Sequence, residues 1–184
     1  MAKIPSHATK VFSGVIFDVY QWEQELFNGK TATFEASRRP STVIIIPVVW
    51  DKIAIAHERQ PGKDRYRTPF AGRIDDGEDV LVAAQRELRE ESGLVSDDRE
   101  LYQTFSIWGK VDYEMYYFLA RDCRKEHIQD LDDGGEEIEV QYISFDEFIF
   151  FIQSEECRDI EFANLIFRME KQWKLEEFSK KLGI

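Results

Sequence analysis

The sequence has 184 residues, 43% of them hydrophobic, and a formal net charge of −12 at pH 7. This length suits one globular domain with a sizeable core, and the charge argues against nucleic acid or an anionic membrane as a partner. No apolar stretch approaches the roughly 20 residues that cross a bilayer, and residues 1–10 lack a hydrophobic signal segment. We therefore expect a cytoplasmic protein whose two cysteines, Cys123 and Cys157, are reduced thiols.

The beginning of the chain indicates an antiparallel β ribbon. Residues 11–18 and 32–35 are typical of strands, and the segment 27–30 (Phe-Asn-Gly-Lys) between them is typical of a turn. We expect residues 1–40 to form an N-terminal antiparallel β-sheet and residues 41–184 to form the main domain. An exposed apolar ribbon such as residues 11–19 (VFSGVIFDV) needs to be covered.

The rest of the chain alternates strand and helix patterns. The β-branched run at residues 42–49 (TVIIIPVV) predicts a strand buried on both faces. Further strands are expected at residues 52–57, 70–73, 101–108, 113–120 and 137–144, helices at 80–92, 145–154 and 160–181, and polar loops at 60–67 and 130–136. This order predicts an α/β (α+β) fold in which helices pack against a mixed sheet.

The predicted helix at residues 80–92 carries an unusual group of acidic side chains. Glu87, Glu90 and Glu91 are three or four residues apart, so all three carboxylates share one face. Each pair repels by roughly 3 kcal/mol at an effective dielectric near 20, and the helix C-terminus also disfavours anions. A hard divalent cation with oxygen ligands removes both objections. A solvated acidic helix face is the alternative when this cluster is considered alone.

The residues around the cluster make a metal site the better interpretation. Gly72 lets the backbone approach the carboxylates closely, and Arg86 can pair with one of them and orient it. The specified positions are Gly72, Glu78, Arg86, Glu87, Leu88, Glu90, Glu91, Gly93 and Leu94. At average residue usage such a spacing arises by chance with odds well below about one in a million.

This spacing resembles the box of the Nudix hydrolases at every specified position. Residues 10–180 also resemble the ADP-sugar (ADP-ribose) pyrophosphatase subfamily in order, with Phe70 inserted in the Pro-Ala-Gly lead into the box. The resemblance implies a Nudix α/β/α sandwich preceded by the N-terminal sheet. It also implies metal-dependent cleavage of the pyrophosphate bond of nucleoside-diphosphate sugars into a nucleoside monophosphate and a sugar phosphate.

The resemblance also implies roles for particular residues. Glu87, Glu90 and Glu91 would bind Mg²⁺ or Mn²⁺ together with the backbone carbonyl of Ala71, and Arg86 would orient this cluster with Glu78. A glutamate of the acidic loop at residues 130–136 would be the general base or a further metal ligand, and Glu136 fits best. A solvated surface loop is the alternative for that segment.

The substrate contacts are less specific. Arg59 follows a predicted strand where the family places a basic residue for the substrate phosphates, with Arg65 and Arg67 as rivals. Glu114 matches a family glutamate that follows the box. Trp108 can stack on a base, although an aromatic residue on a strand is more often part of the core. Trp108 also stands where ADP-ribose-selective members carry a proline, which puts that selectivity in doubt.

Several alternatives stay open. The same machinery would serve a GDP-mannose or broad-range nucleoside-sugar or dinucleotide hydrolase. A hydrolase of oxidised nucleoside triphosphates is less favoured, because such chains tend to lack the long N-terminal sheet. A catalytically dead nucleotide-binding module is the alternative from another class, and the intact glutamates argue against it. The resembled subfamily dimerises through the N-terminal region, so we expect a homodimer.

Overall fold

The structure is a computed structural model that describes residues 4–107, 109–131 and 135–184. Its strands are β1 (Thr9–Ser13), β2 (Asp18–Glu25), β3 (Thr31–Arg38), β4 (Thr42–Val49), β5 (Lys52–Arg59), β6 (Tyr66–Thr68), β7 (Phe70–Arg73), β8 (Leu94–Val95), β9 (Asp98–Ser106), β10 (Val111–Asp112), β11 (Glu114–Arg121), β12 (Arg124–Lys125) and β13 (Glu137–Ile143). Its helices are α1 (Val80–Ser92), α2 (Phe145–Gln153), α3 (Ile160–Lys171) and α4 (Leu175–Leu182).

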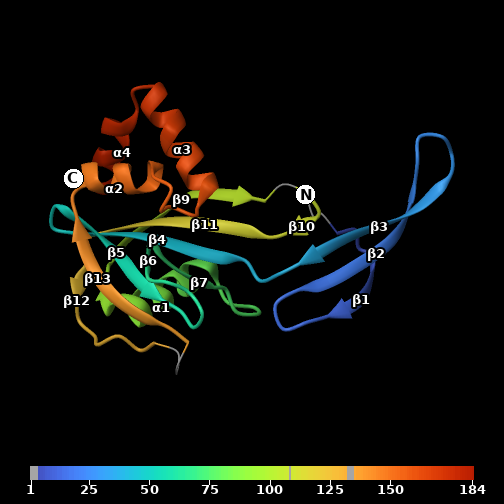
Figure 1. The fold of residues 1–184 in the computed structure, drawn as a ribbon, viewed down its shortest axis with the longest axis horizontal. Coiled ribbons are helices and arrows are strands. Elements are labelled where there is room, and N and C mark those ends of the chain that lie inside the picture. Colours follow the sequence, from blue (N-terminus) through green and yellow to red (C-terminus); the bar gives the residue numbers. More distant parts are fainter. Residues whose placement is uncertain (1–3, 108, 132–134) are drawn as a thin grey trace.

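The main domain is a three-layer sandwich around a mixed sheet. The strand order is β13-β5-β4-β11-β9, with β6 paired to β5 and β7 paired to β4. Strands β4 and β11 run parallel, whereas β11 and β9 are antiparallel. Helix α1 covers one face of the sheet and α2 to α4 cover the other (Figure 1). The predicted α/β/α fold class is therefore confirmed.

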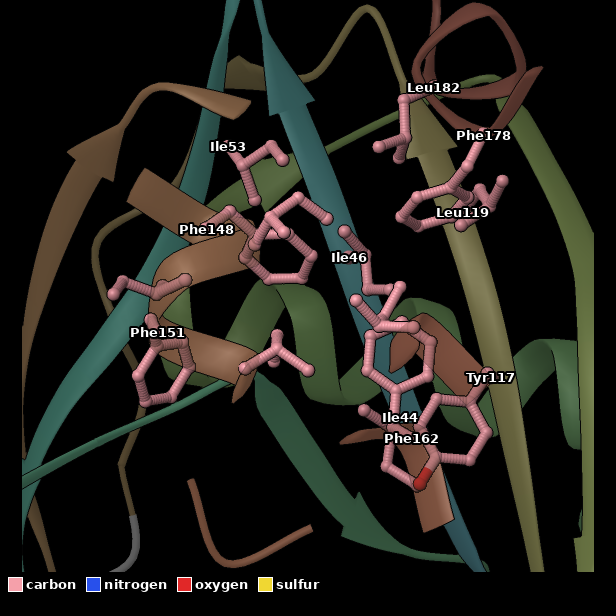
Figure 2. Packing of buried hydrophobic residues seen from close by; sticks show 14 of the residues in the cluster. Ile44, Ile46, Ile53, Tyr117, Leu119, Phe148, Phe151, Phe162, Phe178 and Leu182 are labelled. Atoms are coloured by element: carbon pink, nitrogen blue, oxygen red, sulfur yellow. The ribbon is translucent and has the colours of Figure 1, made fainter. Parts of the chain in front are cut away.

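The sheet separates two hydrophobic cores, because β4 is buried on both faces as its composition predicts. On the side of α2 to α4, Ile46 of β4 packs with Phe148, Phe162 and Phe178 (Figure 2). On the other side, Ala84 and Leu88 of α1 pack with a second set of sheet residues. The buried stripe of α1 fixes the helix to the sheet, so its other side chains project from a rigid element.

The N-terminal sheet has the strand order β1-β2-β3-β10 and extends away from the sandwich (Figure 1). It takes β10 from the middle of the chain, so it is not built from the first forty residues alone. The predicted turn at residues 27–30 is confirmed, with Gly29 at φ 74°. Apolar side chains are exposed on this part of the molecule, among them Phe12 and Val15, at 58% and 99%.

Two sequence-based expectations about element boundaries are wrong. Residues 11–18 do not form one strand, because the Gly14 amide donates to the Phe17 carbonyl at 2.9 Å and the chain turns there. The helix expected at 160–181 breaks between α3 and α4, where Trp173 has a φ of 60°. This break allows Phe162 of α3 and Phe178 of α4 to enter the same core.

The shortest strands escaped the sequence analysis. Strands β8, β10 and β12 have two residues each, which is too few to show a periodicity. Strand β6 begins inside the loop expected at 60–67. Within the described part of the chain, none of the helices combines the length and the apolar character that spanning a membrane requires.

Candidate active site

Helix α1 presents acidic side chains on a well-defined element. The Asp79 side chain caps the helix by accepting from the amides of Leu81 and Val82, and Gly93 ends it in the left-handed conformation at φ 71°. Glu87 and Glu91 are only 9% and 8% exposed. Buried carboxylates are costly unless they are paired or bound to a cation, which indicates a functional rather than a structural cluster.

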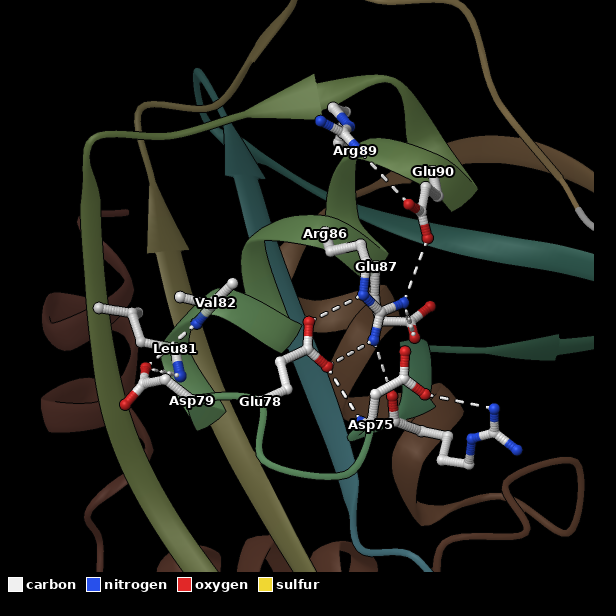
Figure 3. A network of polar contacts seen from close by, with 10 residues as sticks. Asp75, Glu78, Asp79, Leu81, Val82, Arg86, Glu87, Arg89 and Glu90 are labelled. Carbon is white, nitrogen blue, oxygen red and sulfur yellow. Dashed lines mark hydrogen bonds and ion pairs between the residues drawn. The ribbon is translucent and has the colours of Figure 1, made fainter.

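Arg86 donates hydrogen bonds to three glutamates of the acidic cluster (Figure 3). Its Nε and Nη2 donate to the two carboxylate oxygens of Glu78, each at 2.9 Å. Its Nη1 donates to Glu87 Oε1 at 2.6 Å and to Glu90 Oε2 at 3.2 Å, and Nη2 also donates to the Arg73 carbonyl. The forked, planar guanidinium suits this shared contact, because it offers several donors in a fixed geometry.

Strand β7 approaches α1 closely and completes the pocket around the carboxylates. A Cβ placed on Gly72 would lie 1.8 Å from Glu87 Cδ, so only glycine leaves room for that carboxylate. The Ala71 amide donates to Glu91 Oε2 at 3.0 Å. Strand β7 thus holds Glu91 through its backbone and makes space for Glu87.

The pKa values of the carboxyl groups in the cluster are shifted in opposite directions. Burial raises the pKa of Glu91 well above its ordinary value, with a further contribution from the charge of Glu87. Burial also raises the pKa of Glu87, against the opposing effect of Arg86. By contrast, hydrogen bonding to Arg86 lowers the pKa of Glu78 to about 2. Glu78 and Arg86 therefore form a permanent ion pair, whereas Glu87 and Glu91 would be favoured as anions by a cation.

These side chains open into a cavity of about 640 Å³, which we call the acidic cavity. It is lined by Ile16, Gln60, Ala71, Gly72, Arg73, Asp75, Arg86, Glu87, Glu90, Glu91, Asp130 and Glu136. All the residues expected to hold a metal therefore border one cavity, together with Arg86 and Glu136. Glu136 comes from a distant part of the chain and adds to the raised pKa of Glu91 through its charge.

The donor set of this cavity fits a hard divalent cation. Its carboxylate oxygens are the ligands that Mg²⁺ and Mn²⁺ prefer. In the described residues, however, no three His, Cys, Asp or Glu side chains converge as a ready-made ligand group. The reason is visible in the contacts: Arg86 holds Glu87 and Glu90, and the Ala71 amide holds Glu91. The guanidinium supplies the positive charge here, so the glutamates would have to rearrange to share an ion.

The four residues expected to contact substrate lie in different places. Arg59 borders a neighbouring cavity of about 300 Å³ that it shares with Gln60 and Glu136. Arg67 faces away from the acidic cavity, with an ion pair to Glu156 at 2.6 Å. Glu114 accepts a hydrogen bond from Ser106 Oγ at 3.1 Å and does not border the acidic cavity. Trp108 lies outside the described residues.

Two residues near the site, Gln60 and Glu58, escaped the sequence analysis, whereas Asp130 belongs to the acidic loop that it singled out. Gln60 and Asp130 line the acidic cavity, and Glu58 is 7% exposed and raises the pKa of Glu91 through its charge. The Gln60 side chain donates to Glu58 Oε1 at 2.5 Å. The signal that the sequence offered is that Glu58 directly follows the apolar run expected as a strand at 52–57; a glutamate in a buried continuation of that strand needs a partner.

A helix-borne carboxylate cluster at the mouth of a polar cavity is typical of a functional site rather than of a purely structural domain. The family model of the NUDIX domain matches residues 38–162, so the chain belongs to the NUDIX family. It is therefore a Nudix hydrolase, and the Nudix resemblance of the sequence is confirmed.

Comparison with characterised proteins supports the same placement. The chain is 29% identical to the ADP-ribose pyrophosphatase of Bacillus subtilis (strain 168), over 85% of this chain and 86% of that protein. It is 27% identical to a methanol dehydrogenase activator of Bacillus methanolicus, over 82% and 83%. It is 34% identical to the ADP compounds hydrolase NudE of Escherichia coli (strain K12), over 62% and 63%.

A solved structure shares the fold. The crystal structure of an ADP compounds hydrolase superimposes with a TM-score of 0.72, at 21% identity, and covers 92% of this chain and 95% of that one. The likeness includes the N-terminal sheet region, because so little of either chain is left out.

Proposed function

We propose that this Nudix hydrolase cleaves the pyrophosphate bond of ADP-ribose or a similar ADP-sugar, and releases AMP and a sugar phosphate. The observation that carries the proposal is the acidic cavity, which Glu87, Glu90 and Glu91 line together with Glu136. The names of the ADP-ribose pyrophosphatase and the ADP compounds hydrolase among the relatives support the substrate class.

The residues of the cavity divide the work between them. We assign Glu87, Glu90, Glu91 and the Ala71 carbonyl to a Mg²⁺ or Mn²⁺ ion, which would polarise the phosphate oxygens and activate water. Arg86 positions the glutamates through its shared hydrogen bonds. Glu136, which lines the same cavity, accepts the proton of the attacking water as general base.

Arg59 is our candidate for the substrate phosphates. Its ion pair with Glu137 spans 3.4 Å, and both side chains are more than half exposed. Such a surface pair contributes little and is easily exchanged for a phosphate. Arg59 also borders the neighbouring 300 Å³ cavity, and Glu136 lines both that cavity and the acidic cavity. The guanidinium of Arg59 is therefore close to the place where a diphosphate would bind the glutamates.

The experiment that tests this function is a metal-dependent activity screen with product identification. The purified chain is incubated with ADP-ribose, ADP-glucose, GDP-mannose and a dinucleotide, with and without Mg²⁺ or Mn²⁺. We expect AMP and ribose phosphate from ADP-ribose, only with metal. A preference for GDP-mannose or equal rates for all substrates would favour the broad-range alternative. Binding without turnover would favour a nucleotide-binding module.

We also propose that the protein is a cytoplasmic homodimer that buries the N-terminal sheet. Phe12 of β1 and Val15 and Ile16 of the turn that follows it are each more than half exposed, and exposed apolar groups of this size usually mark an interface. Cys123 and Cys157 are both free thiols, which suits a reducing compartment. Light scattering measures the oligomeric state, and a monomer at micromolar concentration would contradict the dimer.

A further inference from the structure

A second cavity borders α1 without being lined by Glu87, Glu90 or Glu91. It has a volume of about 580 Å³, and we call it the rear cavity. Its lining includes Gln85, Arg89, Ser96, Arg99, Arg124 and His127, which come from α1, β9, β12 and the segments beside them. That volume lies within the usual range for small-molecule sites, roughly 300–1,000 Å³.

The charge of the rear cavity is opposite to that of the protein. Apart from Arg86, which the acidic cluster neutralises, three arginines border it (Arg89, Arg99 and Arg124), against two carboxylates, those of Asp97 and Glu126. The whole chain has 24 basic and 36 acidic residues, so an excess of arginine in one cavity is a local departure from the composition. Such an excess attracts small anions.

Arg99 is the central residue of this cavity. It is half-buried, and within the described ranges no carboxylate lies at ion-pair distance from it. Its guanidinium Nε donates to the Gln85 amide oxygen at 3.0 Å when that amide is oriented to satisfy both groups. A neutral amide leaves the charge of Arg99 uncompensated, so the guanidinium keeps its preference for an anionic partner.

The other arginines are only loosely engaged. Arg124 contacts Asp97 at 3.0 Å and Glu126 at 2.5 Å, and all three side chains are about half exposed or more. Arg89 is half exposed and contacts Glu90 at 3.3 Å. Exposed pairs of this kind contribute little, so a better anion can replace them. Arg86, by contrast, is fully engaged by Glu78, Glu87 and Glu90 and takes no part.

We propose that the rear cavity is a binding site for a phosphate group, either inorganic phosphate or the phosphate of a small monoester, held by Arg99 with Arg89 and Arg124. Arginine forks match phosphate oxygens in pairs, which favours phosphate over a simple halide. The acidic cavity cannot offer the same chemistry without a metal, because six carboxylates and two arginines border it.

The site adjoins the catalytic machinery without sharing its ligands. The segment after β12 crosses the end of α1, where the amides of Glu126 and His127 donate to the Gly93 carbonyl. A few residues later the Asp130 amide donates to the Glu90 carbonyl at 2.9 Å. One short segment therefore borders the rear cavity at His127 and the acidic cavity at Asp130.

The test is a titration of the ¹⁵N-labelled full chain followed by amide NMR, with Mg²⁺ present. Inorganic phosphate is one arm, and glycerol 3-phosphate, as a simple monoester, is the other. We expect saturable shifts at residues 95–99 and 124–127 in at least one arm. Tighter binding of glycerol 3-phosphate identifies a monoester site, and equal affinities identify a site for the phosphate group alone.

Variants separate this site from the acidic cavity. Arg99→Gln is expected to raise Kd at least tenfold, which corresponds to the loss of about 1.4 kcal/mol. Arg168→Gln is the matched control, since it removes an exposed arginine from α3 on the other face of the sheet. Thermal unfolding checks that Arg99→Gln folds; if it does not, Arg124→Gln replaces it, with at least a threefold rise in Kd.

Three results would overturn the proposal. One is a set of shifts confined to residues 71–73, 75, 87, 90, 91 and 130, which border the acidic cavity and not the rear cavity. Another is an unchanged Kd in a folded Arg99→Gln or Arg124→Gln protein. The last is the absence of saturation below roughly 10 mM in both arms, which would leave no site of useful affinity.

Discussion

Gly72 of β7 lies directly against the carboxylate of Glu87 on α1, so that a Cβ at residue 72 would meet both carboxylate oxygens at 2.1 Å. Real Cβ atoms do not approach other atoms so closely, so a larger residue must displace the glutamate. The glutamate carboxylate is the end of a flexible side chain. The displacement is therefore expected to reduce activity more than it reduces the stability of the fold.

Gly72→Ala is accordingly expected to fold but to lose activity. We expect kcat to fall by about 100-fold or more, because the transition state loses a positioned carboxylate. Gly29→Ala is the control for activity, because its Cβ would meet no atom within 4 Å at the tip of the N-terminal hairpin; its left-handed φ of 74° should cost some stability and leave turnover unchanged. Activity and thermal unfolding are measured for both. Wild-type turnover by Gly72→Ala would show that Glu87 need not occupy its present position.

Glu91 is expected to lower the free energy of unfolding of the metal-free protein and to be needed for activity. Burial raises its pKa well above 4.5, so between 4.5 and that raised value the folded protein holds a proton that the unfolded chain has released. The free energy of unfolding must then fall as pH rises through this range in metal-free protein. Glu91→Gln should reduce this slope, to which the raised pKa of Glu87 also contributes, and should raise the midpoint of thermal unfolding at pH 8.

The same variant should lose catalysis. We expect kcat of Glu91→Gln to fall by at least about 100-fold. Mg²⁺ should raise the unfolding midpoint of the wild type more than that of the variant, because a bound ion stabilises only the state that binds it. An equal effect of Mg²⁺ on both proteins would remove Glu91 from the proposed ligand set.

Arg86→Lys keeps the positive charge of the side chain but loses the planar guanidinium with its several hydrogen-bond donors. A single ammonium group cannot contact Glu78, Glu87 and Glu90 in the present geometry, so two carboxylates lose a partner. We expect a loss of about 1–3 kcal/mol in the free energy of unfolding, measured with urea. We also expect kcat to fall about tenfold or more. Arg168→Lys on α3 is the control for the exchange itself, and similar losses in both would argue against a special role.

Glu136 and Glu139 provide a paired test of the general base. Glu136 belongs to the acidic loop and lines the acidic cavity, whereas Glu139 of β13 is exposed and contacts His57. Glu136→Gln should lower kcat about 100-fold and should flatten the acidic limb of the pH–rate profile, because the base no longer titrates. Glu139→Gln should stay within a few-fold of wild type. An unchanged profile for Glu136→Gln would assign the base to another residue, with Asp130 the next candidate.

The two arginines near β5 and β6 can be separated by steady-state kinetics. Arg59 borders a pocket shared with Glu136, whereas Arg67 is held by Glu156 on a different side. We expect Arg59→Gln to raise KM for ADP-ribose about tenfold, as the loss of one phosphate contact implies. Arg67→Gln should raise KM less. The reverse order would move the phosphate site to the surface around β6.

The sequence alone determined the parts of this protein that depend on local pattern. The helix α1 was predicted with its observed bounds, because Ala84 and Leu88 repeat at helical spacing and Gly93 ends the helix. The buried strand β4 and the grouping of Glu87, Glu90 and Glu91 follow from spacing in the same way. A periodicity, a cap and a motif are each encoded within a few neighbouring residues, so they can be read without the fold.

Tertiary structure decided what depends on residues that are distant in the sequence. It brought Gln60 and Asp130 to the acidic cavity, placed Arg67 away from it, and buried Glu58 beside Glu91. It also set the turn after Ser13 and the break at Trp173, where packing of separate segments outweighs local helix or strand preference. Contacts between distant segments leave no periodic signal in one sequence, because they depend on how the sheet and helices pack around a shared core.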